Sequence, residues 1–130
     1  MRRALALALL LAGPAGAAEP MSAADFRAAA EGWTLHFRDR NGDYFGSEQY
    51  LENGRTVWLP SGGVCERGIW SEDQGRICFL YAAGLSCWRL YPDGEDGIYA
   101  ESADDGPGVT RIWLERRDRN PVLCPEGPGV

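Results

Sequence analysis

The sequence has no lysine, only one histidine and no hydrophobic run long enough to cross a membrane. All 13 basic residues are arginines, and they stand against 19 aspartates and glutamates. The apolar run at residues 4–12 is far shorter than the roughly 20 residues that a membrane-spanning helix needs, which argues against a membrane anchor. A single histidine also excludes a histidine-rich metal site.

The first 18 residues have the organisation of a secretory signal peptide. Arg2 and Arg3 precede the apolar run, and small residues at 15–18 suit signal peptidase, with cleavage after Ala17 or Ala18. We therefore predict Sec-type export to the periplasm or the medium, with residues 19–130 as a single disulfide-linked domain.

Removal of Arg2 and Arg3 leaves 11 arginines against 19 acidic residues, a net charge near −8. Such an acidic chain is poorly suited to the phosphate backbone of nucleic acids or to anionic membranes. We expect a monomer that needs no cofactor and whose partner is a protein or a small molecule.

One helix and eight strands are predicted. Ser22 is a capping residue type, Asp25 completes a capping box and Gly32 is a stop signal, which predicts a helix over 22–31. Turn pairs such as Asn53-Gly54 then divide the chain into short segments. The strands expected between these turns are 33–38, 43–51, 55–59, 64–70, 76–81, 85–91, 97–101 and 109–116.

This pattern predicts an all-β fold with one short N-terminal α-helix. The sheet is expected to be mainly an antiparallel β meander, as a small barrel or a two-layer sheet. Residues 125–130, after the last cysteine, are predicted to be disordered.

Four cysteines in an exported chain predict two disulfides. A hairpin loop at 81–84 places Cys78 opposite Cys87, at a separation that suits a disulfide. A turn at 71–75 sets Trp70 against Arg76 and leaves Cys65 three residues out of register with Cys78. We therefore predict Cys78–Cys87 and Cys65–Cys124.

The same spacing argues against metal and redox chemistry. Gaps of 12, 8 and 36 residues separate successive cysteines, and Cys-x-x-Cys is absent. Zinc sites and dithiol catalysts use closely spaced pairs, so no metal or redox residue is predicted.

Two glutamates, Glu48 and Glu66, lie within predicted strands, whereas most acidic residues lie in turns. A carboxyl in an apolar pocket has a raised pKa and can serve a hydrolase as general acid. Because Arg55 and Arg67 are available on nearby strands, we favour structural ion pairs. The single histidine, His36, has no serine or cysteine elbow and is expected to be a packing residue.

Two acidic stretches invite comparison with calcium sites. Residues 39–43 (DRNGD) begin like a calcium loop, but Tyr44 and Tyr50 replace its Gly and Glu, so a hairpin turn is predicted. Residues 93–105 carry six acidic residues and no basic one. We expect solvated loops there, with a weak calcium site or a basic partner as alternatives.

The aromatic residues suit either a small core or a ligand surface. Because side chains alternate along a strand, the face opposite Cys78 and Cys87 carries Ile77, Phe79, Trp88 and Leu90. We expect Trp70 and Trp88 to be core residues in a barrel with little room for a ligand. The candidates for a binding surface are Trp33, Trp58, Trp113 and Tyr99.

Three short motifs recur on successive predicted strands: CERGIW at 65–70, ICF at 77–79 and CW at 87–88. This pattern resembles that of small exported proteobacterial proteins, alphaproteobacterial in type, of unknown function. The resemblance implies a Gram-negative periplasm and an all-β fold, and no activity. Gly68-Ile69-Trp70 is also similar to the Gly-x-Trp of lipocalins and barrel-shaped bacterial protease inhibitors, where it opens the first strand.

We therefore expect a non-enzymatic binding domain of the periplasm, for a protein partner or a small ligand. One alternative is a barrel-type inhibitor of a cell-envelope hydrolase, which would present an exposed loop or tail. The other is a carboxylate-dependent hydrolase using Glu48 or Glu66, which would have a pocket holding a carboxyl with a shifted pKa.

Overall fold

The computed structural model describes residues 18–104 and 107–125. The predicted signal peptide up to residue 17, the predicted turn at Asp105-Gly106 and the predicted tail from residue 126 lie outside the described residues. Within the described part of the chain, no helix combines the length and the apolar character that crossing a membrane requires.

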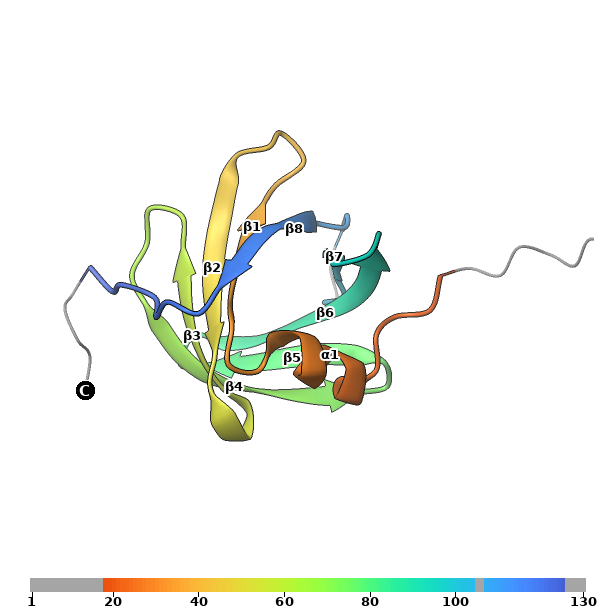
Figure 1. The fold of residues 1–130 in the computed structure, drawn as a ribbon, viewed down its shortest axis with the longest axis horizontal. Coiled ribbons are helices and arrows are strands. Elements are labelled where there is room, and N and C mark those ends of the chain that lie inside the picture. The colour runs from red at the N-terminus through yellow and green to blue at the C-terminus, as the bar shows by residue number, and fades with distance from the viewer. Residues whose placement is uncertain (1–17, 105–106, 126–130) are drawn as a thin grey trace, which may run out of the picture.

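A short helix precedes eight antiparallel strands, as the capping and turn residues predict. The elements are α1 (Ala23–Ala30), β1 (Thr34–Arg38), β2 (Tyr44–Tyr50), a 3-10 turn η1 (Glu52–Gly54), β3 (Arg55–Pro60), β4 (Glu66–Asp73), β5 (Arg76–Tyr81), β6 (Gly84–Asp93), β7 (Gly97–Ser102) and β8 (Arg111–Asp118). Each strand pairs with the next, and β8 pairs with β1, which closes the sheet. The all-β fold with one short helix is confirmed, and the sheet is a closed barrel (Figure 1).

The β5–β6 hairpin has the predicted register, with Cys78 opposite Cys87. These two cysteines are joined in a disulfide, and the second predicted disulfide, Cys65–Cys124, is also present. Both pairings are therefore confirmed.

The predicted register of β4 and β5 is wrong. Gln74 and Gly75 have positive φ angles of 52° and 77° and form a two-residue turn, tighter than the expected turn at 71–75. Trp70 therefore lies opposite Phe79 and not opposite Arg76. The pairing of the cysteines is unaffected, because this shift moves Cys65 still further out of register with Cys78.

Helix α1 closes one end of the barrel. The Ser22 hydroxyl caps the helix by accepting a hydrogen bond from the Asp25 backbone N–H at 3.1 Å. Phe26 is fully buried, and its ring centroid lies 5.3 Å from that of Tyr50 and 5.1 Å from that of Trp70. These edge-on aromatic contacts make this end of the barrel a packed core. The same core contains other residues expected to be buried: Ile77, Phe79, Leu90 and Ile112.

The segment that follows β8 crosses the outside of β2 (Figure 1). The Thr34 hydroxyl donates to the carbonyl of Asn120 at 2.6 Å, and the Val122 N–H donates to Gln49 Oε1 at 3.1 Å. Cys124 then reaches Cys65 in the β3–β4 connection. The C-terminal segment is thus fixed to β1, β2 and the β3–β4 connection.

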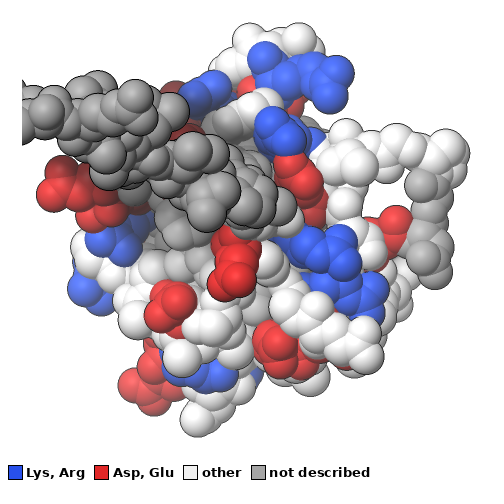
Figure 2. Space-filling view, turned by 90° about the vertical axis from the view of Figure 1, so that its right-hand side faces the viewer, with Lys and Arg blue, Asp and Glu red and all other residues white. Residues whose placement is uncertain are grey.

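Charged residues of both signs are interspersed over the face shown in Figure 2. Among the described residues on that face, arginines do not gather into a broad basic patch. A nucleic-acid-binding surface would carry such a patch, so this face offers no support for one.

Candidate functional site

A cavity of about 360 Å³ opens into the barrel at the end opposite α1. At this end the chain makes the β1–β2, β3–β4, β5–β6 and β7–β8 connections. We call it the barrel cavity. It is lined by Phe37, Phe45, Glu48, Tyr50, Trp58, Glu66, Phe79, Tyr81, Ala83, Gly84, Leu85, Ser86, Trp88, Leu90, Ala100 and Ile112.

The expectation of a barrel with little room for a ligand is therefore wrong. Trp88 is only partly buried and forms part of the cavity wall, whereas Trp70 is 8 % exposed and belongs to the core as predicted. Two inward positions on the neighbouring strands β6 and β7 have small side chains that line this space: Ser86 and Ala100. Aromatic residues elsewhere do not fill the volume that these residues leave.

Two glutamates and a tryptophan form one row across three strands. Glu48 on β2 lies opposite Trp58 on β3, and Trp58 lies opposite Glu66 on β4. Directly opposed residues project from the same face of a sheet, so all three side chains point into the barrel. The barrel cavity therefore brings both candidate carboxyls together with one of the four candidate aromatic residues.

Local backbone features place the aromatic walls. A Cβ atom on Gly46 would lie 2.2 Å from the Trp58 ring, so the glycine leaves room for the indole against β2. A bulge inserts Phe45 between the paired residues Tyr44 and Gly46, and its ring reaches the cavity. The Phe45 ring centroid lies 5.8 Å from that of Trp58 and 6.3 Å from that of Trp88.

Gly68 has a similar role beneath Tyr81. A Cβ atom on Gly68 would lie 2.7 Å from the Tyr81 ring, so only glycine lets this ring pack against β4. In that position the Tyr81 hydroxyl donates to the Glu48 carboxyl, 2.8 Å from Oε1 and 2.9 Å from Oε2. Gly68 of the Gly-x-Trp motif thus allows Tyr81 to reach Glu48, whereas Trp70 of the same motif packs against α1.

Glu48 is 4 % exposed, and burial raises its pKa from the usual 4.5 to about 8. The nearby Tyr81 and Thr56 hydroxyls oppose this rise, and the charge of Glu66 adds to it. Thr56 Oγ1 is itself buried and makes no hydrogen bond within the described residues. Burial also raises the pKa of Tyr81, so its phenol stays protonated beside Glu48.

The ion pairs expected for Glu48 and Glu66 do not form. In the described chain neither glutamate pairs with an arginine. The reason is strand parity: since Trp58 and Glu66 point inward, the alternate residues Arg55 and Arg67 point outward, and both are exposed.

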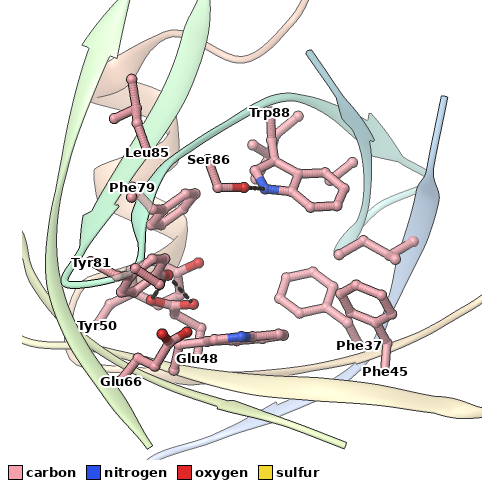
Figure 3. A pocket seen from close by; sticks show the side chains of 16 residues that line it. Phe37, Phe45, Glu48, Tyr50, Glu66, Phe79, Tyr81, Leu85, Ser86 and Trp88 are labelled. Carbon is pink, nitrogen blue, oxygen red and sulfur yellow. Dashed lines mark hydrogen bonds between the residues drawn. The ribbon is translucent and has the colours of Figure 1, made fainter. Parts of the chain in front are cut away.

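Both carboxyls lie on one side of the barrel cavity, beside the rings of Phe79 and Tyr81 (Figure 3). Glu48, Glu66 and Tyr81 lie together on one side, and Phe37 and Phe45 lie across the open space from them. The Ser86 hydroxyl is held by a hydrogen bond from the Trp88 indole N–H at 2.9 Å. A ligand with one polar end and an apolar body matches this division.

The three other candidate aromatic residues lie outside the cavity, each beside an arginine. Guanidinium groups of Arg117 and Arg119 lie 4.3 Å and 3.8 Å from the Trp33 ring centroid. Trp113 and Tyr99 are directly opposed on β8 and β7. The Arg38 guanidinium lies 5.8 Å from the Trp113 ring centroid, and that of Arg111 lies 5.2 Å from the Tyr99 ring centroid. Stacking with arginine therefore accounts for the positions of these rings.

His36 forms a chain of hydrogen bonds on the outside of the barrel. Its Nδ1 lies 2.6 Å from Ser47 Oγ, and its Nε2 lies 2.9 Å from Asp118 Oδ2. This is the order of groups in a hydrolase triad, but Ser47 is 4 % exposed, its hydroxyl also contacts Tyr44, and none of these residues lines the barrel cavity. These hydrogen bonds instead link β2, β1 and β8 where the barrel closes.

Several residues of the acidic stretches have structural roles. Asp39 accepts hydrogen bonds from the backbone N–H groups of Asn41 and Asp43, as the predicted hairpin turn requires. In residues 93–104, Glu101 pairs with Arg111 and Asp104 accepts from the Cys87 N–H. The described residues contain no group of three or more metal-ligating side chains.

The fold and the cavity define an up-and-down β-barrel that is closed by a helix at one end and hollow at the other. The chain matches no protein-family model, no curated protein and no solved structure. The resemblance to small exported proteobacterial proteins therefore stays a prediction.

The grouping of Glu48, Trp58 and Glu66 was missed from the sequence, although a signal for it exists. Glu48 and Trp58 are equally far from Asn53, and Trp58 and Glu66 are equally far from Gly62. Centring the two hairpins on these turn residues would have placed the three side chains in one row.

Proposed function

We propose that this protein is an exported binding protein that takes one small, largely apolar molecule into the barrel cavity without transforming it. The observation that carries the proposal is the cavity itself. Its volume of about 360 Å³ lies within the range of small-molecule sites, roughly 300–1,000 Å³. Its walls are mainly aromatic and aliphatic, and eight-stranded barrels are wide enough to hold one small ligand.

Two further features support export as part of the proposal. Both pairs of cysteines are joined as disulfides, which persist in oxidising compartments such as the periplasm. The first 18 residues have the organisation of a signal peptide. Export predicts a mature N-terminus at Ala18 or Glu19, which N-terminal sequencing of protein from the periplasmic fraction would establish.

The binding proposal is tested with a neutral apolar fluorophore, N-phenyl-1-naphthylamine, titrated into the exported, oxidised protein. We expect saturable binding of one molecule, with the rise in emission that follows transfer into an apolar site. Ser86→Phe places a ring inside the cavity and should abolish binding. Ser71→Phe makes the same substitution at an exposed position on β4 and should leave binding unchanged.

Failure of the fluorophore to bind the folded wild-type protein would contradict the proposal. Equal binding by wild type and Ser86→Phe would also contradict it, because the fluorophore would then occupy some other surface. Urea unfolding of both variants shows whether each is folded when binding is measured.

A hydrolase is the second candidate, and one observation favours it. Glu48 lines the cavity with a pKa raised to about 8, so it is protonated at neutral pH as a general acid must be. Incubation with a panel of 4-nitrophenyl glycosides and esters would test this. Release of nitrophenol that Glu48→Gln abolishes would replace the binding proposal, whereas we expect no release above the rate in buffer.

A further inference from the structure

The barrel cavity contains acidic side chains and no basic one. Glu48 and Glu66 both line it, and none of the sixteen lining residues is an arginine or a histidine. A carboxylate buried without a cation is strongly disfavoured, which is why Glu48 holds its proton. The site therefore lacks a positive charge, and a cationic ligand can supply one.

The groups around Glu48 are suited to its ionised form. The Tyr81 hydroxyl already donates to the carboxyl, and the buried Thr56 hydroxyl next to it makes no hydrogen bond in the described structure. An ionised carboxylate accepts several hydrogen bonds, so two donors are in place for it. No cation competes for Glu48 among the described residues: β1 contributes Leu35 opposite it, and the other titratable neighbours are Tyr50 on β2 and Glu66 on β4.

Aromatic rings lie both beside the carboxyls, where Trp58 is directly opposed to Glu48 and to Glu66, and across the open space from them. Phe37 and Phe45 lie across the cavity from Glu48 in Figure 3, and the Trp58 indole lies next to Phe45. The faces of aromatic rings attract ammonium groups, and rings combined with a carboxylate are a recurrent means of binding them.

We propose that the ligand of the barrel cavity is a small organic ammonium ion with an apolar body, and that Glu48 releases its proton to solvent when this ion enters. The ammonium nitrogen lies beside the carboxylates of Glu48 and Glu66, and the apolar body lies against the aromatic wall. The inference rests on the proposed function, since it names the class of ligand that the same cavity takes.

Proton release makes the binding depend on pH in a defined direction. Below about pH 8 the proton on Glu48 competes with the ammonium ion, so the affinity rises with pH. It rises by up to about tenfold per pH unit and levels off above pH 8, because one proton leaves for each ion bound. A neutral ligand of the same shape displaces no proton, and its affinity should not follow this curve.

The test compares phenyltrimethylammonium with its neutral carbon isostere, tert-butylbenzene. Each competes with N-phenyl-1-naphthylamine on the exported, oxidised protein at about pH 6 and pH 8.5. At pH 8.5 we expect the cation to bind about tenfold more tightly than the isostere, or better. At pH 6 the cation should weaken about tenfold or more while the isostere stays unchanged.

Calorimetry of phenyltrimethylammonium binding in two buffers of different ionisation enthalpy measures the number of protons released per ion bound. Close to one proton should be released per ion bound at about pH 7. Glu48→Gln keeps a partner for Tyr81 and removes the charge. It should bind tert-butylbenzene as wild type does, bind the cation about tenfold more weakly, and release no proton.

Glu115→Gln is the matched control, because it makes the same change in charge at an exposed position on β8 and should alter none of these values. Equal affinities of the wild-type protein for the two isosteres at pH 8.5 would overturn the inference. A Glu48→Gln variant that keeps wild-type cation affinity would also overturn it. In either case continued binding of the fluorophore leaves the proposed function standing, whereas loss of all three ligands overturns both.

Discussion

Glu48 is a carboxyl buried inside the barrel, and the pH dependence of the stability of the fold should report this. Its pKa is about 8 in the folded protein and close to 4.5 when unfolded, so between these values the folded state holds the extra proton. The contribution of Glu48 to stability is therefore fully present below about pH 4.5 and is lost as the pH rises through about 8.

Glu48→Gln should remove this dependence. The difference in the free energy of unfolding between the variant and wild type should grow in favour of the variant as pH rises from about 5 to 8. The slope is at most about 1.4 kcal/mol per pH unit. Urea unfolding across this range measures it, and Glu115→Gln should follow the wild-type curve. Parallel curves for wild type and Glu48→Gln would mean that the buried carboxyl has an ordinary pKa.

Trp70 and Trp88 provide a second contrast between single residues. Trp70→Ala should lower the free energy of unfolding by about 3–5 kcal/mol, because it leaves a hole beneath α1. Trp88→Ala should cost clearly less, since one side of that ring already faces the barrel cavity, and it should weaken binding of N-phenyl-1-naphthylamine. Urea unfolding and fluorophore titration of both variants decide this. Equal losses of stability would place Trp88 in the core after all.

Among the elements, α1 closes one end of the barrel, and Phe26 is the larger of its two buried side chains, the other being Ala30. Phe26→Ala should destabilise the protein by about 3–5 kcal/mol, because the ring is fully buried between Tyr50 and Trp70. Ser22→Ala removes only the helix cap and should cost about 1 kcal/mol. Thermal or urea unfolding compares them. A Phe26→Ala variant no less stable than Ser22→Ala would show that the barrel closes without the helix.

Elements with a strong local cause were predictable from the sequence. The helix follows from Ser22 and Gly32, and all eight strands follow from the turn residues between them. Register was predictable only where the length of the turn was clear. Leu80 faces Leu85 as expected, but the turn at Gln74 is tighter than expected, because a non-glycine residue there adopts a positive φ angle.

The candidate site depended on three-dimensional information that the sequence carries only indirectly. The sequence marks Glu48, Glu66 and Trp58 individually as candidates. Their side chains lie together only because the registers of both the β2–β3 and the β3–β4 pairs align them. The expected ion pairs failed because the arginines of β3 and β4 have the opposite strand parity. The open volume could not be predicted either, since it depends on how small residues from β6 and β7 align with the aromatic residues of the other strands around a closed barrel.

At the scale of the whole molecule, one end of the barrel is packed around α1 and the other is hollow. The packed end needs no ligand to bury its side chains, and the hollow end leaves Trp58 and Trp88 only partly buried. The disulfide Cys78–Cys87 lies within one hairpin, whereas Cys65–Cys124 joins the last described segment to the middle of the chain. Cys65–Cys124 is therefore the disulfide that constrains the molecule as a whole.

Replacing Cys65 and Cys124 together by serine tests this role. The disulfide spans 59 residues, and in the chain-entropy model a loop of this length stabilises the folded state by about 4 kcal/mol. We expect a loss of about that size in urea unfolding under oxidising conditions. Fluorophore binding by the folded variant should be unchanged, because neither cysteine lines the barrel cavity. A loss below about 1 kcal/mol would mean that the contacts of Asn120 and Val122 with β1 and β2 hold the C-terminal segment without the disulfide.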